Sequence, residues 1–586
     1  MASKTPRAVA PKIHPPKIHP LRALKSQLPH VGEAGSRSAA LHEDRSGGDT
    51  PYSANTWPIG PNHRLRLRIS MILGTVGSIM IAIGGRGAGA WPVVDNPGWK
   101  LSWVVNLNRM LHSSTVLVFF GIGLLVIAWI FLARFCVETN RRAAELVPLS
   151  VLWRTFALWV LPLLFTAPLF TQDIYSYLAQ GSIAARGWDP YSAGPVDLLG
   201  PQDPLARSVP LLWSHSPSPY GPTALGYGAV ISWVTQDQIL WGVLLHRLVS
   251  VAGLVLASWA LIRLARRCKV APHTALWLGV LNPLAILHLV GGIHNEALML
   301  GLMLAGLELV LRGTDDEPRP LISRWILIVM GLALITSAGL VKVTAFLALG
   351  FAGVMIALWL GGKLRHLAIS AVLCFVAAAI FSVLLSLITG VGFGWITSQG
   401  GAVDIVSWMS VSSLAGLASS ALGMLLGLGD HQESALGVFR ALGILVGLAW
   451  VTRMLWASFK RRIHPVGGLG VAMFCLVIFF PVVHPWYLLW AIFPLAAWAN
   501  RDLFVYVVAG YSMAFSFFIL PKGLSLPPET VLYIYVMSAV IFGLFVATAW
   551  ALCKTRPQLA AALQTGQSGE GTQLKALRRP RKQVVS

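Results

Sequence analysis

Long apolar runs alternate with short polar or basic segments along most of this chain. Runs of roughly 17–25 residues recur from residue 67 almost to residue 553, and each is long enough for a helix to cross a hydrocarbon core about 30 Å thick. Backbone groups that face lipid must be hydrogen-bonded within their own segment, so helices are the required form. The pattern predicts an all-α polytopic membrane protein.

We expect about 13–14 membrane-spanning helices, and these lie near residues 67–85, 113–133, 152–170, 239–262, 273–290, 297–311, 325–341, 344–361, 366–389, 435–457, 467–482, 486–499, 502–519 and 530–552. Basic clusters set the orientation by the positive-inside rule, which places both chain ends in the cytoplasm. Two apolar pieces do not fit this parity. Residues 223–234 are expected to be re-entrant or flat on the membrane, and residues 391–433 to form an outer loop followed by a hairpin or half-span.

The composition agrees with a membrane protein, because 55% of the 586 residues are hydrophobic, only 12% are charged and the mean hydropathy is +0.68. The net charge of +22 is concentrated at the ends: residues 1–68 hold 11 Lys/Arg against 4 Asp/Glu, and residues 554–586 hold 7 against 1. We therefore predict basic, disordered cytoplasmic tails over 1–66 and 554–586, flanking a transmembrane domain over 67–553. Contact with anionic lipid is favoured over binding of nucleic acid.

One polar stretch, residues 171–222, interrupts the apolar pattern for about fifty residues. A connection of this length is usually functional or disordered. Its aromatic residues argue against disorder, and its carboxylates offer chemistry; these are Trp188, Trp213, Tyr175, Tyr177, Tyr191, Tyr220, Asp173 and Asp189. The predicted topology places the stretch outside the cell, so we interpret it as an outer catalytic loop.

Other polar residues beside apolar runs fall on the same predicted outer side, namely His294, Asn295, Glu296, Lys342 and His484. Ionisable groups at membrane depth are costly and rare, which makes them functional candidates by default. Because these residues and Asp173 gather at one rim, the sequence predicts one outward-facing cavity.

Each candidate also has a structural explanation. Asp173 could cap the helix that follows it, Lys342 could extend to the membrane interface, and Arg86 and Arg109 could bind lipid headgroups. The remaining alternatives concern short motifs: a satisfied turn at a helix start for His294–Glu296, an aromatic belt with a proline stop for His484–Tyr487, and rigid turns for Asp189–Tyr191 and Ser218–Pro222.

The sequence lacks the phosphate-binding loop, the nucleophile elbow and the zinc-protease motif of soluble enzymes. One carboxylate with basic and histidine side chains on the same membrane face suits transfer of a sugar from a lipid phosphate. The carboxylate would act as general base on the acceptor hydroxyl, and Lys, Arg or His would stabilise the leaving phosphate. No Asp-x-Asp pair stands in the outer loops and the five cysteines show no paired spacing, so we expect no obligatory metal or other cofactor and no disulfide.

At these residues the chain resembles the polyprenol-phosphate-mannose-dependent alpha-(1->6)-mannopyranosyltransferases of mycobacteria and corynebacteria (MptB-type). The matching stretches are QDIYSYLAQG (172–181), WDPYSAGP (188–195), SPYGP (218–222), HRLV (246–249), ALWLGVLNPL with GGIHNEALMLGLML (275–304), GFGWI (392–396), GLGDH (427–431), HPVGGLGVA (464–472) and HPWYLLWAIFPLAAWA (484–499). They cover nearly the whole membrane region and leave out the basic tails.

The resemblance implies a many-helix integral membrane glycosyltransferase of the GT-C type. It also implies decaprenyl-phosphate mannose as donor, a phosphatidylinositol mannoside or related glycolipid as acceptor, inversion of the donor linkage, and alpha-1,6 products on the way to lipomannan and lipoarabinomannan. Asp173 would be the base; family enzymes often place the aspartate in the first outer loop, where this chain has Asp95. The substrate-binding residues expected with it are Asp189, Tyr175, Tyr191, Tyr220, His294, Asn295, Glu296, Lys342, His484 and Trp486.

Two other classes of function stay open on the residues alone. A transporter or flippase of a lipid-linked glycan commonly shows paired repeats and charges at mid-bilayer; no repeat is visible here, and the charges gather at one rim. A polymerase or ligase of a longer lipid-linked polymer, or a transferase of another sugar such as arabinose, is separated from the mannosyltransferase only by the resemblance.

Overall fold

The computed structural model describes residues 61–92, 102–137, 146–399, 406–407, 409–499, 501–523 and 526–555. The regular elements in these residues are all helices, which confirms the all-α class. Most of the two predicted tails, and the alternative base Asp95, lie outside the described residues.

Eight helices in the described part of the chain are long and apolar enough to cross a membrane on their own. Each coincides with one predicted span. They are α2 (Pro61–Ala88), α4 (Leu111–Leu132), α11 (Ile239–Arg267), α14 (Glu296–Thr314), α15 (Leu321–Gly339), α17 (Leu364–Thr389), α19 (Gln432–Phe459) and α23 (Pro528–Thr555).

The other six predicted spans are helical but broken or short. One is a pair of helices, Pro272–Leu278 (α12) and Pro283–Gly291, that meet at a bend of 50° and that count together as a ninth span. The others are Leu149–Phe165 (α5 and η3), Val343–Trp359 (η5 and α16), Pro465–Phe479 (α20), Pro485–Trp498 (η8 and α21) and Asp502–Phe515 (α22). By length and composition, eight helices of the described residues, or nine with the bent pair, can each cross a membrane, compared with the 13–14 expected. Proline is a main reason, since Pro283, Pro465 and Pro485 each lie in the first turn of a new helix and proline cannot continue an existing one.

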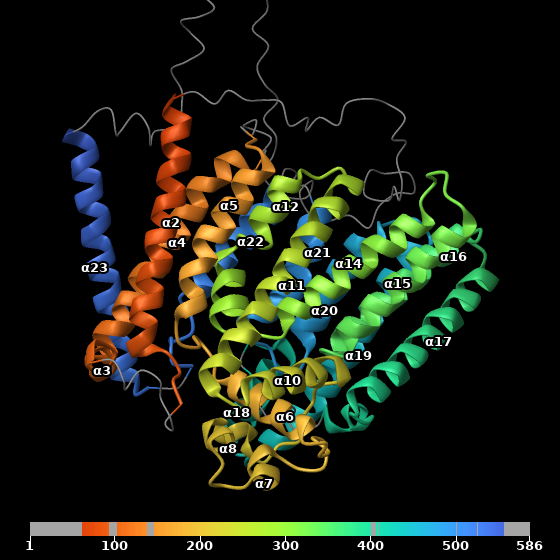
Figure 1. The fold of residues 1–586 in the computed structure, drawn as a ribbon, viewed down its shortest axis with the longest axis horizontal. Helices are drawn as coiled ribbons and strands as arrows, with labels where there is room; N and C mark the ends of the chain where they lie inside the picture. Colours follow the sequence, from red (N-terminus) through yellow and green to blue (C-terminus); the bar gives the residue numbers. More distant parts are fainter. Residues whose placement is uncertain are drawn as a thin grey trace, which may run out of the picture.

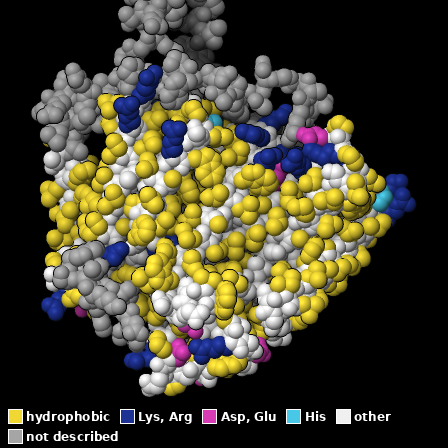
Figure 2. Space-filling model, in the orientation of Figure 1, with side chains coloured by type: hydrophobic (Ala, Val, Ile, Leu, Met, Phe, Trp, Pro, Cys, Tyr) yellow, Lys and Arg dark blue, Asp and Glu magenta, His cyan; other side chains and the backbone are white. Residues whose placement is uncertain are grey.

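The two ends of the helical body differ in composition. The start of α2 and the end of α23 lie at the same end (Figure 1). Lys and Arg side chains gather along that end, above a broad hydrophobic belt (Figure 2). The opposite end carries α6 (Asp173–Ala185), α7 (Pro195–Leu199) and α8 (Pro204–Ser208).

The predicted outer loop is therefore a small helical unit. It contains α6, α7, α8 and α9 (Leu211–Ser214), and α10 (Pro222–Thr235) follows directly. Helix α10 has 14 residues, too few to cross a membrane, as the sequence indicated for residues 223–234. It packs closely on α6, because a Cβ at Gly181 would lie 2.6 Å from the carbonyl oxygen of Gly228.

Two ion pairs of Arg186 connect the helices of this unit. The Arg186 guanidinium lies 3.6 Å from the Asp203 carboxylate and 3.3 Å from that of Asp237. The Asp237 carboxylate also accepts hydrogen bonds from the hydroxyls of Ser182 and Ser232. These ion pairs and hydrogen bonds join the end of α6, the start of α8 and the end of α10, so the polar stretch has a defined structure.

Candidate active site

The ends of four segments meet beside this helical unit and bring the predicted polar residues together. Asp173 is the first residue of α6, and Glu296 is the first residue of α14 with His294 two positions before it. Lys342 follows α15, and His484 precedes η8 (Pro485–Leu488). Residues that are more than 300 positions apart in the sequence thus share one site.

One ring nitrogen donates a hydrogen bond to the Asp173 carboxylate, and a second lies close to it. The indole N–H of Trp213 donates to Oδ1 at 3.3 Å, and Nδ1 of His294 lies 3.8 Å from Oδ2. The N-cap position of α6 belongs to Gln172, and no side chain caps the helix, so the capping explanation of Asp173 is wrong. The side chain is 29% exposed. It is therefore a fixed carboxylate that a substrate can reach.

Lys342 forms an ion pair with a buried acid. Its Nζ lies 2.6 Å from Oε1 of Glu296, whose side chain is 2% exposed, while Lys342 is 21% exposed. The same ammonium lies over the rings of Tyr487 and Trp490, 4.3 and 4.9 Å from their centroids. Lys342 does not extend to the interface as the structural alternative supposed. It is a fixed cation with one accessible side.

A stack of rings forms the floor of the site. Trp486 stacks with His484 at 4.6 Å, with His294 at 4.1 Å and with His288 at 5.0 Å between centroids. Trp486 is buried, so it does not belong to an interfacial aromatic belt. His288 lies in the π-helical turn η4 (Ile286–Gly291) and was missed by the sequence analysis, because it is one histidine within an apolar run.

Several buried nitrogens of this floor have no hydrogen-bond partner. They are His288 Nδ1, His294 Nε2, Trp486 Nε1 and Trp490 Nε1. Buried polar atoms without partners are rare in folded proteins, and each calls for an explanation such as a ligand or a water.

Tyrosines line the side nearest α10. Tyr220 meets Tyr177 edge-on at 5.4 Å, and its carbonyl accepts the Tyr191 hydroxyl at 2.9 Å. The Tyr227 hydroxyl donates to the Asn295 side chain. Asn295 therefore contacts α10 through Tyr227. Tyr191, Tyr220 and Tyr227 are partly exposed, whereas Tyr177 is buried.

Two of the predicted substrate-binding residues use their polar groups in hydrogen bonds to the backbone. Tyr175 is buried and its hydroxyl donates to the carbonyl of Ala90, so it offers no accessible polar group. Asp189 lies in an exposed turn, where its carboxylate accepts the Tyr191 N–H at 3.0 Å. This is the rigid turn that was the structural alternative for Asp189, and the geometry accounts for the residue without a substrate.

The sequence analysis gave no role to Arg247, although it quoted the HRLV motif that contains it. The side chain is 1% exposed and lies in the first third of the apolar helix α11, where a charged residue is itself a functional signal. Its guanidinium donates to four backbone carbonyls, those of Val290 (3.1 Å), Leu164 (2.9 Å), Thr166 (2.8 Å) and Ala167 (3.3 Å). Arg247 therefore ties the segment before Asp173 to the turn before His294.

Two strained residues lie in those same connections. Phe170 and Ile293 have φ values of 66° and 58°, a region that non-glycine residues seldom occupy and that costs about 1–3 kcal/mol. Each is within three positions of Asp173 or His294. The clamp by Arg247 helps to keep both connections in this conformation.

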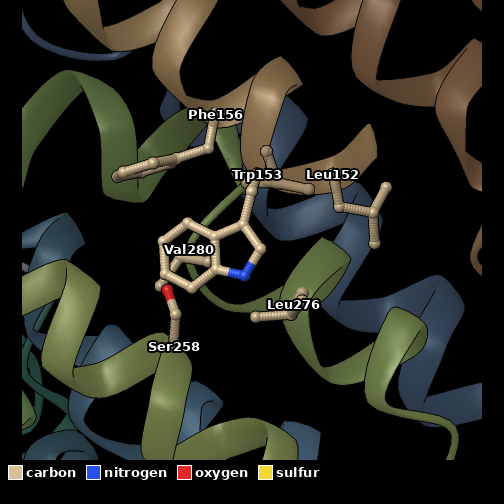
Figure 3. Close-up of a pocket in the computed structure, with 7 residues that line it drawn as sticks. Leu152, Trp153, Phe156, Ser258, Leu276 and Val280 are labelled. Atoms are coloured by element: carbon tan, nitrogen blue, oxygen red, sulfur yellow. The ribbon is translucent and has the colours of Figure 1, made fainter. Parts of the chain in front are cut away.

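A small apolar cavity lies elsewhere, between α5, α11 and α12 (Figure 3). Its volume is about 10 Å³ and its lining includes Trp153, Phe156 and Leu276. A space of that size holds about one water molecule, so it cannot take a sugar. No site residue lines it.

No group of three or more His, Cys, Asp or Glu among the described residues is placed to hold a metal ion. The cysteines Cys136, Cys268, Cys374 and Cys475 are free.

Comparison with known proteins gives one consistent family. The family model described as "Alpha-(1->6)-mannopyranosyltransferase, N-terminal domain" matches residues 71–358, and the MptB C-terminal domain matches residues 412–547. The chain is 49% identical to alpha-(1->6)-mannopyranosyltransferase B of Corynebacterium glutamicum, over 93% of this chain and 94% of that protein. It is 43% identical to a probable alpha-(1->6)-mannopyranosyltransferase of Mycolicibacterium smegmatis (76% and 82% covered) and 40% identical to one of Mycobacterium tuberculosis (80% and 83% covered).

Proposed function

The chain belongs to the alpha-(1->6)-mannopyranosyltransferase family, and from this premise we propose that it transfers mannose from polyprenyl-phosphate mannose to a mannolipid acceptor. The product would be an alpha-1,6 linkage in the core of lipomannan and lipoarabinomannan, and the acceptor a phosphatidylinositol mannoside or related glycolipid. The names of the relatives favour a transferase over the transporter alternative.

The observation that carries this proposal is an accessible carboxylate and an accessible ammonium at one rim. Asp173 and Lys342 are each partly exposed, and the His484 ring packs against Tyr487, the same ring that lies under the Lys342 ammonium. Transfer from a lipid phosphate needs a base for the acceptor and a cation for the leaving group. This pair of residues can supply both.

The proposed reaction is a single displacement. Asp173 takes the proton of the acceptor 6-hydroxyl as that oxygen forms a bond to the anomeric carbon. The bond from this carbon to the phosphate oxygen breaks, and its electron pair leaves with the polyprenyl phosphate. Lys342 and His484 stabilise the charge that develops on the phosphate. Attack opposite the leaving group inverts the anomeric configuration.

The structure changes the role proposed for His294. The sequence analysis counted histidine among the groups that could stabilise the leaving phosphate, but His294 lies beside the Asp173 carboxylate. We propose that it orients the base. No step in this scheme requires a divalent metal, and we expect chelator to leave the rate unchanged.

We further propose that the site faces the outside of the plasma membrane and that both termini are cytoplasmic. The concentration of Lys and Arg at the end opposite α6 (Figure 2) supports this orientation by the positive-inside rule. The isoprenoid chain of the donor would then lie in membrane lipid with its phosphate at the rim.

A membrane assay tests the function and the base together. Membranes containing the protein are given radiolabelled polyprenyl-phosphate mannose and a synthetic alpha-1,6-dimannoside. Wild type should form a trimannoside, and Asp173→Asn, which keeps the shape but cannot accept a proton, should be slower by about a hundredfold.

The control variant is Asp95→Asn, which alters the other family-like position for the base. It should keep near wild-type transfer. If Asp173→Asn is fully active while Asp95→Asn is inactive, the base is assigned wrongly. If wild type transfers no mannose, the proposed function is wrong.

A further inference from the structure

Residues 187–215 fold back so that Trp213 reaches Asp173 from 40 positions away. Contacts between residues close in sequence stabilise the fold of this segment. Asp203 caps α8 by accepting the N–H of Leu205 at 2.8 Å, and His215 Nδ1 lies 2.8 Å from the Asp197 carboxylate. A Cβ at Gly194 would lie 2.3 Å from the backbone of His215. The start of α7 and the end of α9 therefore touch, and Trp213 is presented in a fixed place.

The hydrogen bond from Trp213 constrains the carboxylate without using it up. An indole has one N–H donor and no acceptor, so it fills one lone pair of Asp173 Oδ1. His294 approaches the other oxygen. The carboxylate keeps further lone pairs for an acceptor hydroxyl, and the bond fixes the plane in which those lone pairs lie.

The Trp213 ring is also open to a ligand. Trp213 and Tyr220 are both partly exposed, and both pack on one small apolar cluster that includes Ile174, Tyr177 and Leu178. The two rings therefore lie around the same support, close to the start of α6. Aromatic faces present a large apolar surface with little conformational freedom, which matches the C–H face of a pyranose.

The surroundings of Trp213 favour the acceptor over the donor. Lys342, Glu296 and Trp490 come from the ends of apolar helices, as a lipid-linked donor requires. Trp213 comes from the unit that carries α7 and α8 beyond α6 (Figure 1), where Arg186, Asp197 and His215 are exposed. A mannoside headgroup that arrives from water meets this side first.

We propose that Trp213 has two roles: its N–H positions the Asp173 carboxylate, and its ring, beside Tyr220, forms the subsite for the accepting mannose. Nothing in the sequence motifs assigned it either role. The inference rests on the proposed function, because it names the part of that site that selects the acceptor.

Two substitutions separate the roles in the dimannoside assay. Trp213→Phe keeps an aromatic face but removes the N–H, so kcat should fall about 10- to 100-fold, as expected for loss of a hydrogen bond to a charged group. The acceptor KM should stay within about threefold. Trp213→Leu removes the face as well, so the acceptor KM should rise a further 3- to 10-fold or so, while the donor KM is unchanged in both variants.

The matched control is Trp188→Phe. Trp188 is 45% exposed in the same polar unit and lies against Arg186, not Asp173, so both constants should equal those of wild type. Thermal unfolding in detergent checks that all variants are folded.

Each outcome decides a separate point. Wild-type kcat in Trp213→Phe would overturn the positioning role. Equal acceptor KM in Trp213→Phe and Trp213→Leu would overturn the subsite, and a rise in donor KM instead would place Trp213 on the donor side. A wild type that transfers no mannose overturns the proposed function and, with it, this inference.

Discussion

Two clusters of charged residues, at opposite ends of the helical body, differ in how completely their polar groups are bonded. At the basic end, Arg267 donates to both oxygens of Glu308, at 2.7 and 3.0 Å, and to Asp315 at 3.2 Å. Arg319 pairs with Asp315 and Glu317, and Arg324 donates to backbone carbonyls of the same loop. The Arg267, Glu308 and Asp315 side chains are all at most 6% exposed.

The cluster around Asp173 and Lys342 is incomplete by comparison. Its two charged residues at the rim remain partly exposed, and four ring nitrogens in its floor have no partner. A buried network whose groups are all satisfied rigidifies the fold. A network in which some donors and acceptors have no hydrogen-bond partner keeps the capacity to bind a substrate. The two clusters therefore differ in bonding in the way expected of a structural ionic cluster and of the proposed catalytic one.

The largest effect is expected from Arg267→Met. The change leaves Glu308 buried without its arginine partner and removes one of the two arginines that pair with Asp315, which should lower the free energy of unfolding by about 3–5 kcal/mol. Transfer per folded molecule should not change. Denaturation of the purified protein in detergent micelles measures the first quantity and the mannose assay the second.

Arg263→Met is the control on the same helix, because Arg263 lies over Trp259 at 5.0 Å and such a contact contributes about 0.5–1 kcal/mol at an exposed site. A variant at Arg267 that is as stable as wild type would contradict the structural reading of this cluster.

Lys342→Met should have the next largest effect, and mainly on activity. It removes the cation that we propose stabilises the leaving phosphate, and we expect transfer to slow by about a hundredfold. It also leaves Glu296 unpaired, so stability should fall as well. The double variant Lys342→Met with Glu296→Gln removes that unpaired charge; it should regain stability but not transfer. Recovery of transfer in the double variant would show that Lys342 acts only as a structural partner of Glu296.

Asp189→Ala should have the smallest effect. The side chain caps an exposed turn, and changes at such positions usually alter stability little, so transfer should stay within about twofold of wild type in the dimannoside assay. A loss comparable to that of Asp173→Asn would instead place Asp189 against the acceptor, as the sequence alone suggested.

The sequence determined the features that depend on local pattern. Apolar runs of helical length predicted the all-α membrane class, and the eight long helices each match a predicted span. The polar residues at the ends of those runs predicted that Asp173, His294, Glu296, Lys342 and His484 belong to one rim. Composition and periodicity suffice for this, because each helix responds to lipid along its own length.

Tertiary structure alone decided which of these groups act on one another. The bond from Trp213 to Asp173 joins residues 40 positions apart, the Lys342–Glu296 pair 46, and the carbonyls bound by Arg247 lie 43 to 83 positions away. The hydrophobic periodicity of the sequence carries no information about contacts between residues so far apart in the chain. They follow from packing between helices, such as the close approach of Gly181 to Gly228, and from the breaks at Pro283, Pro465 and Pro485. The sequence therefore predicted that the polar residues share one face, and the packing of helix ends determined which carboxylate is positioned by its neighbours as the proposed base.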